Sequence, residues 1–320
     1  MIARLPLVGR SQPGWRDRRV QELVAYAYRR VPYYRRLFDA HGVRPERIRG
    51  VADLTLVPTT TRGELARLHS GGPAASGLAA SRAWLEQRRL AAARAYALEG
   101  AGLRRDERLV CIGAGESAAP RERRVLDCLL DAVGLPLEQT LADFGRPDET
   151  AARLAAVGAD VVLGSGSTLA PIADAFDRRA AVRLVLSGCD PLTPALRDRL
   201  QRGFGAPVRE IYCSPEFGVM ACECPAGGPL HTCDDGMVLE VLEPDDRPAA
   251  PGRVGEIVGT NLHAFGVPLI RVRTGDHASL ARECGCGGTN GTIDNLVRRP
   301  RQGERPRAQT EAGGESPRVA

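Results

Sequence analysis

The sequence lacks one of the twenty amino acids altogether. It contains no lysine, and all 44 of its basic residues are arginine. No reaction step can therefore use a lysine ammonium group from these 320 residues. Arginine does not replace lysine freely, because the guanidinium is a planar, delocalised charge whereas the ammonium is a compact one.

Long hydrophobic runs are also absent. No apolar stretch reaches the roughly 18 residues that a membrane-spanning helix needs, so no membrane partner is expected. The first ten residues are too short and too interrupted by arginine to form a secretory signal. These absences predict a cytoplasmic protein, whose nine cysteines are thiols or metal ligands rather than disulfides.

A strong charge of one sign is missing as well. The formal net charge of +5 is modest, and it indicates a solvated surface rather than a nucleic-acid site. The hydrophobic fraction of 43% is enough to support a core. A chain of this length forms one large domain or two ordinary ones.

Helical and strand-like segments alternate in the middle of the chain. Apolar strand patterns at 109–115, 159–163 and 182–186 are separated by helical patterns at 121–133 and 148–157. This alternation is typical of a parallel sheet covered by helices.

The flanking regions have different patterns. Residues 15–40 carry apolar residues at helical spacing, and residues 238–258 alternate and turn like antiparallel strands. After Val297 the apolar content nearly disappears, so we expect 298–320 to be a disordered basic tail. The sequence therefore predicts an α/β fold with helix-covered mixed sheets and a smaller antiparallel β subdomain.

Several short stretches carry polar groups where strands end. R-E-I-Y-C-S-P-E-F-G at 209–218 begins as an apolar strand and reaches an acid through a tight turn. Open α/β sheets bind ligands at the carboxyl ends of their strands. S-G-C-D-P-L at 187–192 and G-S-G-S-T-L-A-P at 164–171 are further strand-to-turn segments. The hydroxyls of 164–171 either cap the following helix or line a substrate pocket.

These stretches resemble the phenylacetate-CoA ligase-like branch of the adenylate-forming (AMP-binding) enzymes. V-P-Y-Y-R-R-L-F at 31–38 is similar to the family's N-terminus, and P-L-I-R-V-R-T-G-D at 268–276 matches the family's P-L-I-R-Y-R-T-G-D at all but one position. The resemblance implies the family's large domain at 1–297, with an N-terminal helical segment at 15–65. The family's small C-terminal domain, which supplies a lysine, is expected to be absent.

The resemblance also implies roles for the residues around the acid of the 209–218 stretch. Tyr212 would stack on adenine, with Glu210 near the adenine amine. Asp276 would hold the ribose hydroxyls, which suits a carboxylate that accepts two hydrogen bonds. Ser214 would contact phosphate, and Glu216 would help to hold magnesium.

Two glycine-containing segments complete the implied site for ATP or AMP. Gly188 and Asp190 would pack beside adenine. Ser70, Gly71 and Gly72 stand at the family's phosphate loop, where backbone N–H groups point at phosphate.

Cysteine and histidine side chains gather in the last third of the chain. Thiolates and an imidazole at the ends of two hairpins suit tetrahedral zinc. The candidate ligands are Cys222, Cys224, His231, Cys233, Cys284 and Cys286. The resemblance selects Cys224, His231, Cys284 and Cys286, with Cys222 and Cys233 as alternates. Four protein ligands leave no open position, so the zinc would be structural, in a β region at about 217–290.

The implied function is the AMP-forming activation of a carboxylic acid, an aryl or short acyl acid, for transfer to coenzyme A. The partners would be the acid or its acyl-CoA, and a separate small domain or a carrier protein. Two alternatives stay open. In the first alternative, the protein has lost adenylation and only binds an acyl, aryl or CoA ligand. In the second, the pocket transfers acyl groups without ATP. Cys189 and Cys213 stand where the family has glycines, and a thiolate there could accept an acyl group.

Overall fold

The structure is a computed structural model, and it describes most of the chain between residues 14 and 299. The described residues are 14–69, 92–93, 95–104, 106–112, 140–141, 146–177, 179–214, 216–281 and 284–299. Ser70, Gly71 and Gly72 of the expected phosphate loop lie outside them, as do the expected helix 121–133 and the chain from residue 300.

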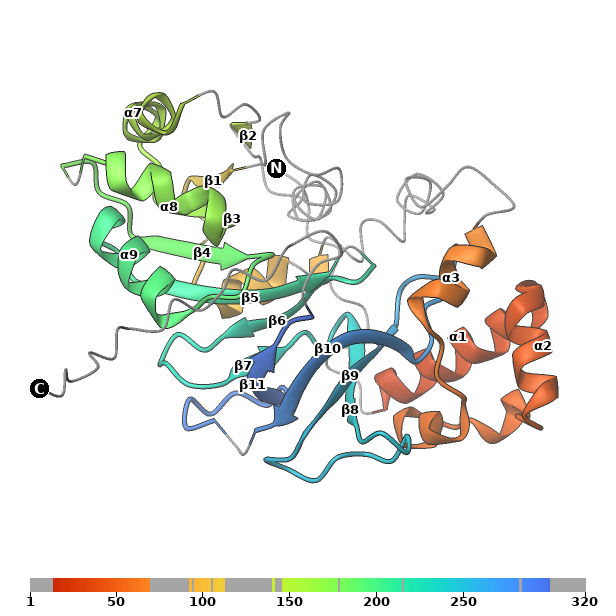
Figure 1. The fold of residues 1–320 in the computed structure, drawn as a ribbon. Coiled ribbons are helices and arrows are strands. Elements are labelled where there is room, and N and C mark those ends of the chain that lie inside the picture. Colours follow the sequence, from red (N-terminus) through yellow and green to blue (C-terminus); the bar gives the residue numbers. More distant parts are fainter. Residues whose placement is uncertain are drawn as a thin grey trace, which may run out of the picture.

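The described strands form a single mixed sheet (Figure 1). Its order is β2-β1-β3-β4-β5-β6-β7-β11-β10-β9-β8. The antiparallel strands continue the hydrogen-bonded ladder of the parallel ones at β5, which pairs parallel with β4 and antiparallel with β6. The expected α/β fold is therefore present, but the antiparallel strands expected to form a smaller subdomain belong to the same mixed sheet.

The parallel half alternates with helices, as predicted. Its elements are β1 (Leu109–Ile112), β2 (Thr140–Leu141), α7 (Pro147–Val157), β3 (Val161–Ser165), α8 (Gly166–Ala175), β4 (Leu184–Gly188), α9 (Pro194–Phe204) and β5 (Val208–Ser214). Alternate strand residues face opposite sides. Val110 and Val162 pack with α7, α8 and α9, while Leu109 and Val161 pack with Leu98 on the other face. Both faces of these strands are buried, which explains their continuous apolar character.

The antiparallel half holds the predicted strands of 238–258. Its elements are β6 (Gly218–Glu223), β7 (Leu230–Thr232), β8 (Met237–Leu242), β9 (Val254–Asn261), β10 (Val272–Leu280) and β11 (Thr292–Val297). Apolar side chains from these strands and from Tyr212 of β5 form one cluster. The two halves therefore share packing as well as hydrogen bonds.

The N-terminal helices cover the β8–β10 end of the sheet (Figure 1). They are α1 (Trp15–Arg30), α2 (Pro32–Ala40), η1 (Pro45–Arg47), η2 (Val51–Leu56) and α3 (Arg62–His69). Pro32 begins α2, where its missing N–H costs nothing. The buried Tyr34 hydroxyl donates to Pro268 O at 3.0 Å and accepts from Ile270 N at 3.1 Å. Among the residues described, no helix is long and apolar enough to cross a membrane.

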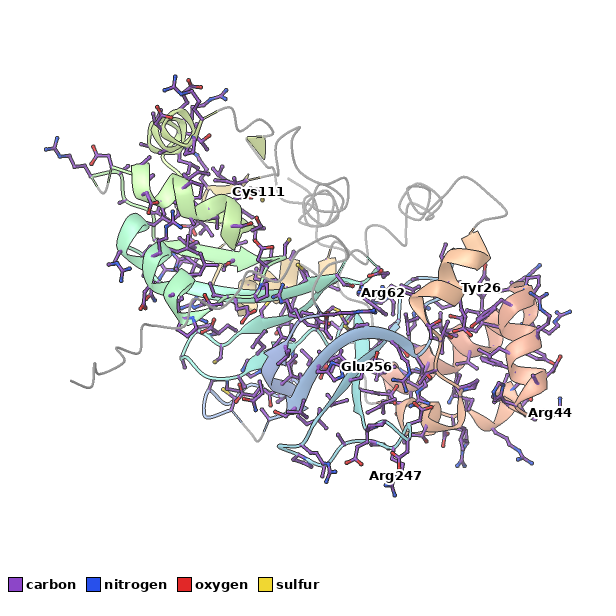
Figure 2. All side chains as sticks on the ribbon, in the orientation of Figure 1. Tyr26, Arg44, Arg62, Cys111, Arg247 and Glu256 are labelled. Atoms are coloured by element: carbon purple, nitrogen blue, oxygen red, sulfur yellow. The ribbon has the colours of Figure 1, made fainter. Side chains whose placement is uncertain are left out.

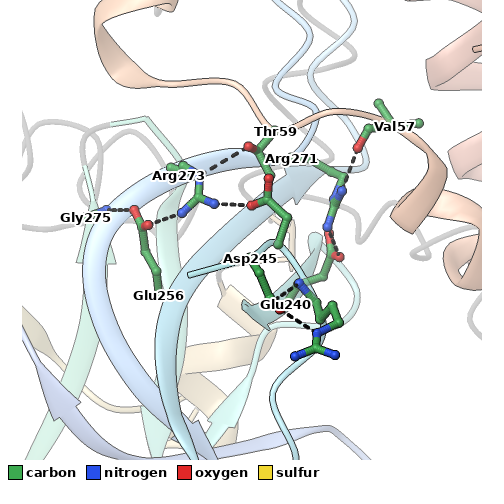
Figure 3. A network of polar contacts seen from close by, with 10 residues as sticks. Val57, Thr59, Glu240, Asp245, Glu256, Arg271, Arg273 and Gly275 are labelled. Carbon is green, nitrogen blue, oxygen red and sulfur yellow. Dashed lines mark hydrogen bonds and ion pairs between the residues drawn. The ribbon is translucent and has the colours of Figure 1, made fainter. Parts of the chain in front are cut away.

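Arginine side chains serve two different purposes on this scaffold. Arg44 and Arg247 project from the surface (Figure 2). Arg271 instead lies under the N-terminal segment, with only 2% of its side chain exposed. Its Nε and Nη2 donate to the two carboxylate oxygens of Glu240 at 3.1 and 3.0 Å, and its Nη1 donates to Val57 O at 2.6 Å (Figure 3). One guanidinium therefore joins the residue before β10 to β8 and to the segment after η2.

We expect Arg271→Lys to lower the free energy of unfolding by about 1–3 kcal/mol, because a lysine keeps the charge but cannot make all three fork contacts. Urea unfolding of the full chain measures this loss. Arg247→Lys is the matched control, since Arg247 pairs with Asp245 at the surface and exposed pairs contribute less than about 1 kcal/mol. Equal effects of the two substitutions would contradict the special role of Arg271.

Candidate active site and thiol cluster

Tyr212 and Asp276 meet at the edge where the two halves of the sheet join. The Tyr212 hydroxyl donates to Asp276 Oδ2 at 2.9 Å, and the Arg299 backbone N–H donates to Asp276 Oδ1 at 2.8 Å. Tyr212 has no exposed surface, and this burial raises the pKa of its hydroxyl well above the ordinary value. The structure thus brings together the two residues predicted to hold adenine and ribose.

Register shifts in β5 and β10 orient the side chains of Tyr212 and Asp276. The register of β5 shifts between Tyr212 and Cys213, and that of β10 shifts between Arg273 and His277. Gly275 has a φ of 79° within the second shift, a conformation that favours glycine. Bulges of this kind bend a strand and redirect a side chain, and Asp276 follows directly.

Glu210 lies beside Tyr212 but is already paired. Arg298 Nη2 donates to Glu210 Oε1 at 3.0 Å and to Ile211 O at 3.0 Å. The guanidinium Cζ lies over the Tyr212 ring, 5.5 Å from its centroid. Burial raises the pKa of Glu210, and the charge of Arg298 opposes that rise.

Sequence reasoning missed Arg298 and Arg299, because it placed them in a tail without a pattern. Their side chain and backbone contacts with Glu210, Tyr212 and Asp276 put them in the candidate site. No apolar periodicity in the sequence distinguishes these two arginines. Their position directly after the strand that ends at Val297 was the only feature that could have indicated a role in the site.

Gly188 and Asp190 lie at the end of β4, close to the start of α8. Asp190 Oδ2 accepts from the Ser167 backbone N–H at 2.9 Å and from the Ser167 hydroxyl at 2.5 Å. Ser165 caps α8, since its Oγ accepts from Thr168 N at 3.2 Å. The Ser165 hydroxyl of the 164–171 turn therefore acts as a helix cap, one of the two expected roles.

Ser214 and Glu216, the predicted catalytic pair, lie at the turn from β5 to β6. Ser214 is buried, and its Oγ accepts from Phe217 N at 3.2 Å, which stabilises the turn. Glu216 Oε2 lies 3.3 Å from Arg62 Nη2 of α3. A cation at Glu216 would therefore compete with Arg62, a residue that the motif did not reveal.

Cys189 and Cys213 face each other across the ends of β4 and β5. Their Sγ atoms are 3.9 Å apart and both residues are buried. The hydrogen bond with Cys213, together with burial, raises the pKa of the Cys189 thiol well above its ordinary value. A buried thiol of raised pKa is a poor nucleophile, which argues against acyl transfer at this pair.

A separate cluster gathers the four residues selected as metal ligands. The ligand atoms of Cys224, His231, Cys284 and Cys286 all lie within 4.8 Å of one another. Cys224 Sγ and Cys284 Sγ are 3.6 Å apart, and Cys286 Sγ is 3.3 Å from His231 Nε2. Tetrahedral zinc with Zn–S bonds of about 2.3 Å places its sulfur ligands about 3.8 Å apart. The donor set and its spacing therefore fit zinc.

Two hairpins build this cluster. Cys224 follows β6 and His231 belongs to β7, where it pairs with Cys222 on one side and Thr292 of β11 on the other. Cys284 and Cys286 come from the β10–β11 connection. Soft donors from both hairpins thus meet at one point.

The alternates Cys222 and Cys233 lie nearby but do not belong to the group of clustered ligand atoms. Both are buried in the apolar cluster beneath residues 98–103. A cavity of about 300 Å³ is lined by both of these thiols and also by Cys224, His231 and Cys286 of the metal-ligand cluster. This cavity does not lie at Tyr212 and Asp276.

Comparisons with known proteins agree with this architecture. No family model matches the sequence. The chain is 29% identical to phenylacetate-coenzyme A ligase of Thermus thermophilus, over 86% of this chain and 67% of the relative. It is 26% identical to the enzyme of that name from Escherichia coli K12, over 81% of this chain and 64% of the relative. The chain therefore spans about two thirds of the length of these relatives.

Solved structures show the same fold. 2-Hydroxyisobutyryl-CoA ligase in complex with 2-HIB-AMP and CoA superimposes with a TM-score of 0.74, at 20% identity, over 90% of this chain and 69% of that one. The fold is thus that of the adenylate-forming enzymes. In sequence, the chain is similar to phenylacetate-CoA ligases over most of its length. The names of these relatives include coenzyme A. They do not mention a carrier protein, so the comparisons do not support that predicted partner.

Cys286 is expected to react fastest with iodoacetamide among the thiols that the structure describes, in protein freed of metal. It is exposed, and a hydrogen bond from the Gly288 N–H lowers the pKa of its thiol. Cys111 is the slow reference, because burial raises its thiol pKa to about 12. Peptide mass spectrometry over time gives both rates, and faster labelling of Cys111 would contradict the assignment.

Proposed function

We propose that this chain is the nucleotide- and acid-binding part of an AMP-forming acid–CoA ligase. The observation that carries the proposal is the meeting of Tyr212, Glu210 and Asp276 at the carboxyl end of β5, on the fold of the adenylate-forming enzymes. An aromatic ring and two carboxylates suit a base and a ribose. The relatives' names support a carboxylic acid and coenzyme A as the substrates.

Each residue has a definite chemical task in this proposal. Asp276 accepts hydrogen bonds from two ribose hydroxyls, and Tyr212 stacks on the base. Glu210 accepts from an exocyclic amine of the base. Glu216 supplies a hard oxygen ligand for magnesium, which requires Arg62 to move away. Ser70, Gly71 and Gly72 keep their proposed contact with phosphate.

Activation of an acid concentrates negative charge on a phosphoryl group, so catalysis depends on placed positive charge. In these 320 residues that charge comes from arginine alone. The acid is an aryl or short acyl acid in this proposal, held in the large domain at 1–297.

The four-residue cluster is proposed to hold a structural zinc in the β region at about 217–290. Three thiols and one imidazole fill a tetrahedral shell, so no position remains for substrate. The zinc would tie the β6–β7 turn to the β10–β11 connection and so fix the strands that position Asp276.

The wild-type chain is expected to bind AMP and to catalyse ATP–pyrophosphate exchange with at least one acid of an aryl and short acyl panel. Asp276→Asn should weaken AMP binding at least about tenfold, because it loses charged hydrogen bonds to ribose. Asp294→Asn, an exposed change on β11, is the control. Calorimetry measures binding. No affinity of the wild-type chain for AMP or an acyl-adenylate mimic would end the ligase proposal.

One zinc per chain is expected by elemental analysis after dialysis, and Cys224→Ser or Cys284→Ser should abolish it. Cys222→Ser and Cys233→Ser should retain it, since these thiols lie in the apolar core. Burial raises the pKa of Cys224 to about 11, so zinc must displace thiol protons. The apparent affinity should therefore fall as the pH is lowered. Zinc retained by the first pair and lost by the second would identify the alternates as ligands.

A further inference from the structure

The ring proposed to stack on a base is fully covered. Tyr212 has 0% exposed surface. Tyr212 belongs to the apolar cluster that includes Phe217 and Met220, and the guanidinium of Arg298 also lies over the ring. A base can reach Tyr212 only after one of these groups moves, and Arg298 is the polar one.

Arg298 makes the contacts that an aminopurine would make. Its guanidinium is planar and delocalised, and it lies 5.5 Å from the Tyr212 centroid, within cation–π range. Its Nη2 donates to Glu210 and to the Ile211 carbonyl, both at 3.0 Å. An exocyclic amine on a stacked base could use the same two acceptors.

The next residue uses the other acid of the site. The Arg299 backbone N–H donates to Asp276 Oδ1, and the Tyr212 hydroxyl takes Asp276 Oδ2. Both carboxylate oxygens that would accept ribose hydroxyls are therefore engaged. Two adjacent residues of the chain thus occupy acceptors at both ends of the proposed nucleoside position.

The fit of Arg298 is incomplete. Its side chain is only 7% exposed, yet Nε and Nη1 are buried without a hydrogen-bond acceptor among the residues that the structure describes. Buried donors left without a partner destabilise the arrangement that holds them. A contact with this flaw is easier to displace than a fully satisfied ion pair.

We propose that Arg298 and Arg299 form a strap that occupies the nucleoside position, with Arg298 as an internal substitute for the base, so that nucleotide binding must displace it. This inference rests on the proposed nucleotide function. It predicts that the strap weakens the affinity of the chain for nucleotide, and that truncating the Arg298 side chain raises that affinity.

Arg298→Ala in the full chain tests the strap. AMP should bind at least about tenfold more tightly than to wild type, because the competing charged hydrogen bonds are gone. Arg298→Lys, which keeps the charge but loses the planar group, should bind with intermediate affinity. Arg253→Ala is the charge-matched control, since Arg253 pairs with Glu243 at an exposed position away from the site.

Hydrogen exchange of the wild-type chain tests the same strap without a variant. The Arg299 amide is held by Asp276, so AMP should speed its exchange, whereas ordinary ligand contact would slow it. Tighter binding by Arg298→Ala together with faster exchange supports the strap. Unchanged or weaker binding by that variant, or slower exchange in wild type, overturns it.

Failure of the function itself would look different. If neither wild type nor Arg298→Ala binds AMP while both unfold cooperatively, the nucleotide function falls, and the strap with it. If wild type binds AMP and Arg298→Ala binds no better, only the strap falls and Arg298 is a brace or a ligand contact.

Discussion

The hydrogen bond from Tyr212 to Asp276 depends on the curvature of the whole sheet. Three strands lie between β5 and β10 in the ladder, so a flat sheet would hold these two strands about 19 Å apart. They are bonded at 2.9 Å, which requires the antiparallel half to curl back over the end of β5, as β10 does in Figure 1. The register shifts lie beside these same two residues. The curvature of the sheet and the contact between Tyr212 and Asp276 therefore depend on the same irregularities in β5 and β10.

A chain without lysine builds its buried cations from guanidinium groups, and these groups also fix geometry. Arg271 holds three elements together through a fork, and Arg197 grips both oxygens of Glu223 beside β5. Fork contacts specify orientation as well as charge. The cost is that a guanidinium with fewer acceptors than donors is left unsatisfied, and within the described part of the chain Arg298 is in that position.

Much of this arrangement could be predicted from local patterns. Alternating apolar segments identify the parallel half because its strands are buried on both faces. The spacing of Cys and His gave six candidate ligands, and the family resemblance selected the four that meet in the structure. Contacts across the curled sheet could not be predicted, since no local pattern encodes curvature. The pairing of Glu216 with Arg62 and the place of Arg298 belong to this second class. The residues proposed to bind nucleotide were predicted from the resemblance to family motifs alone. Their hydrogen bonds with one another and with Arg298 become visible only in the structure.

Strand β11 connects the thiol cluster to the candidate nucleotide site. It pairs with His231 through Thr292 at its beginning, shortly after Cys284 and Cys286, and it ends directly before Arg298. A strand of six residues is about 20 Å long and resists bending along its hydrogen-bonded ladder. The position of the β10–β11 connection and the position of Arg298 are therefore linked through β11 and its pairing with β10 and β7. A metal at the cluster would act on the distant site through this strand, by position alone and without any change in charge there.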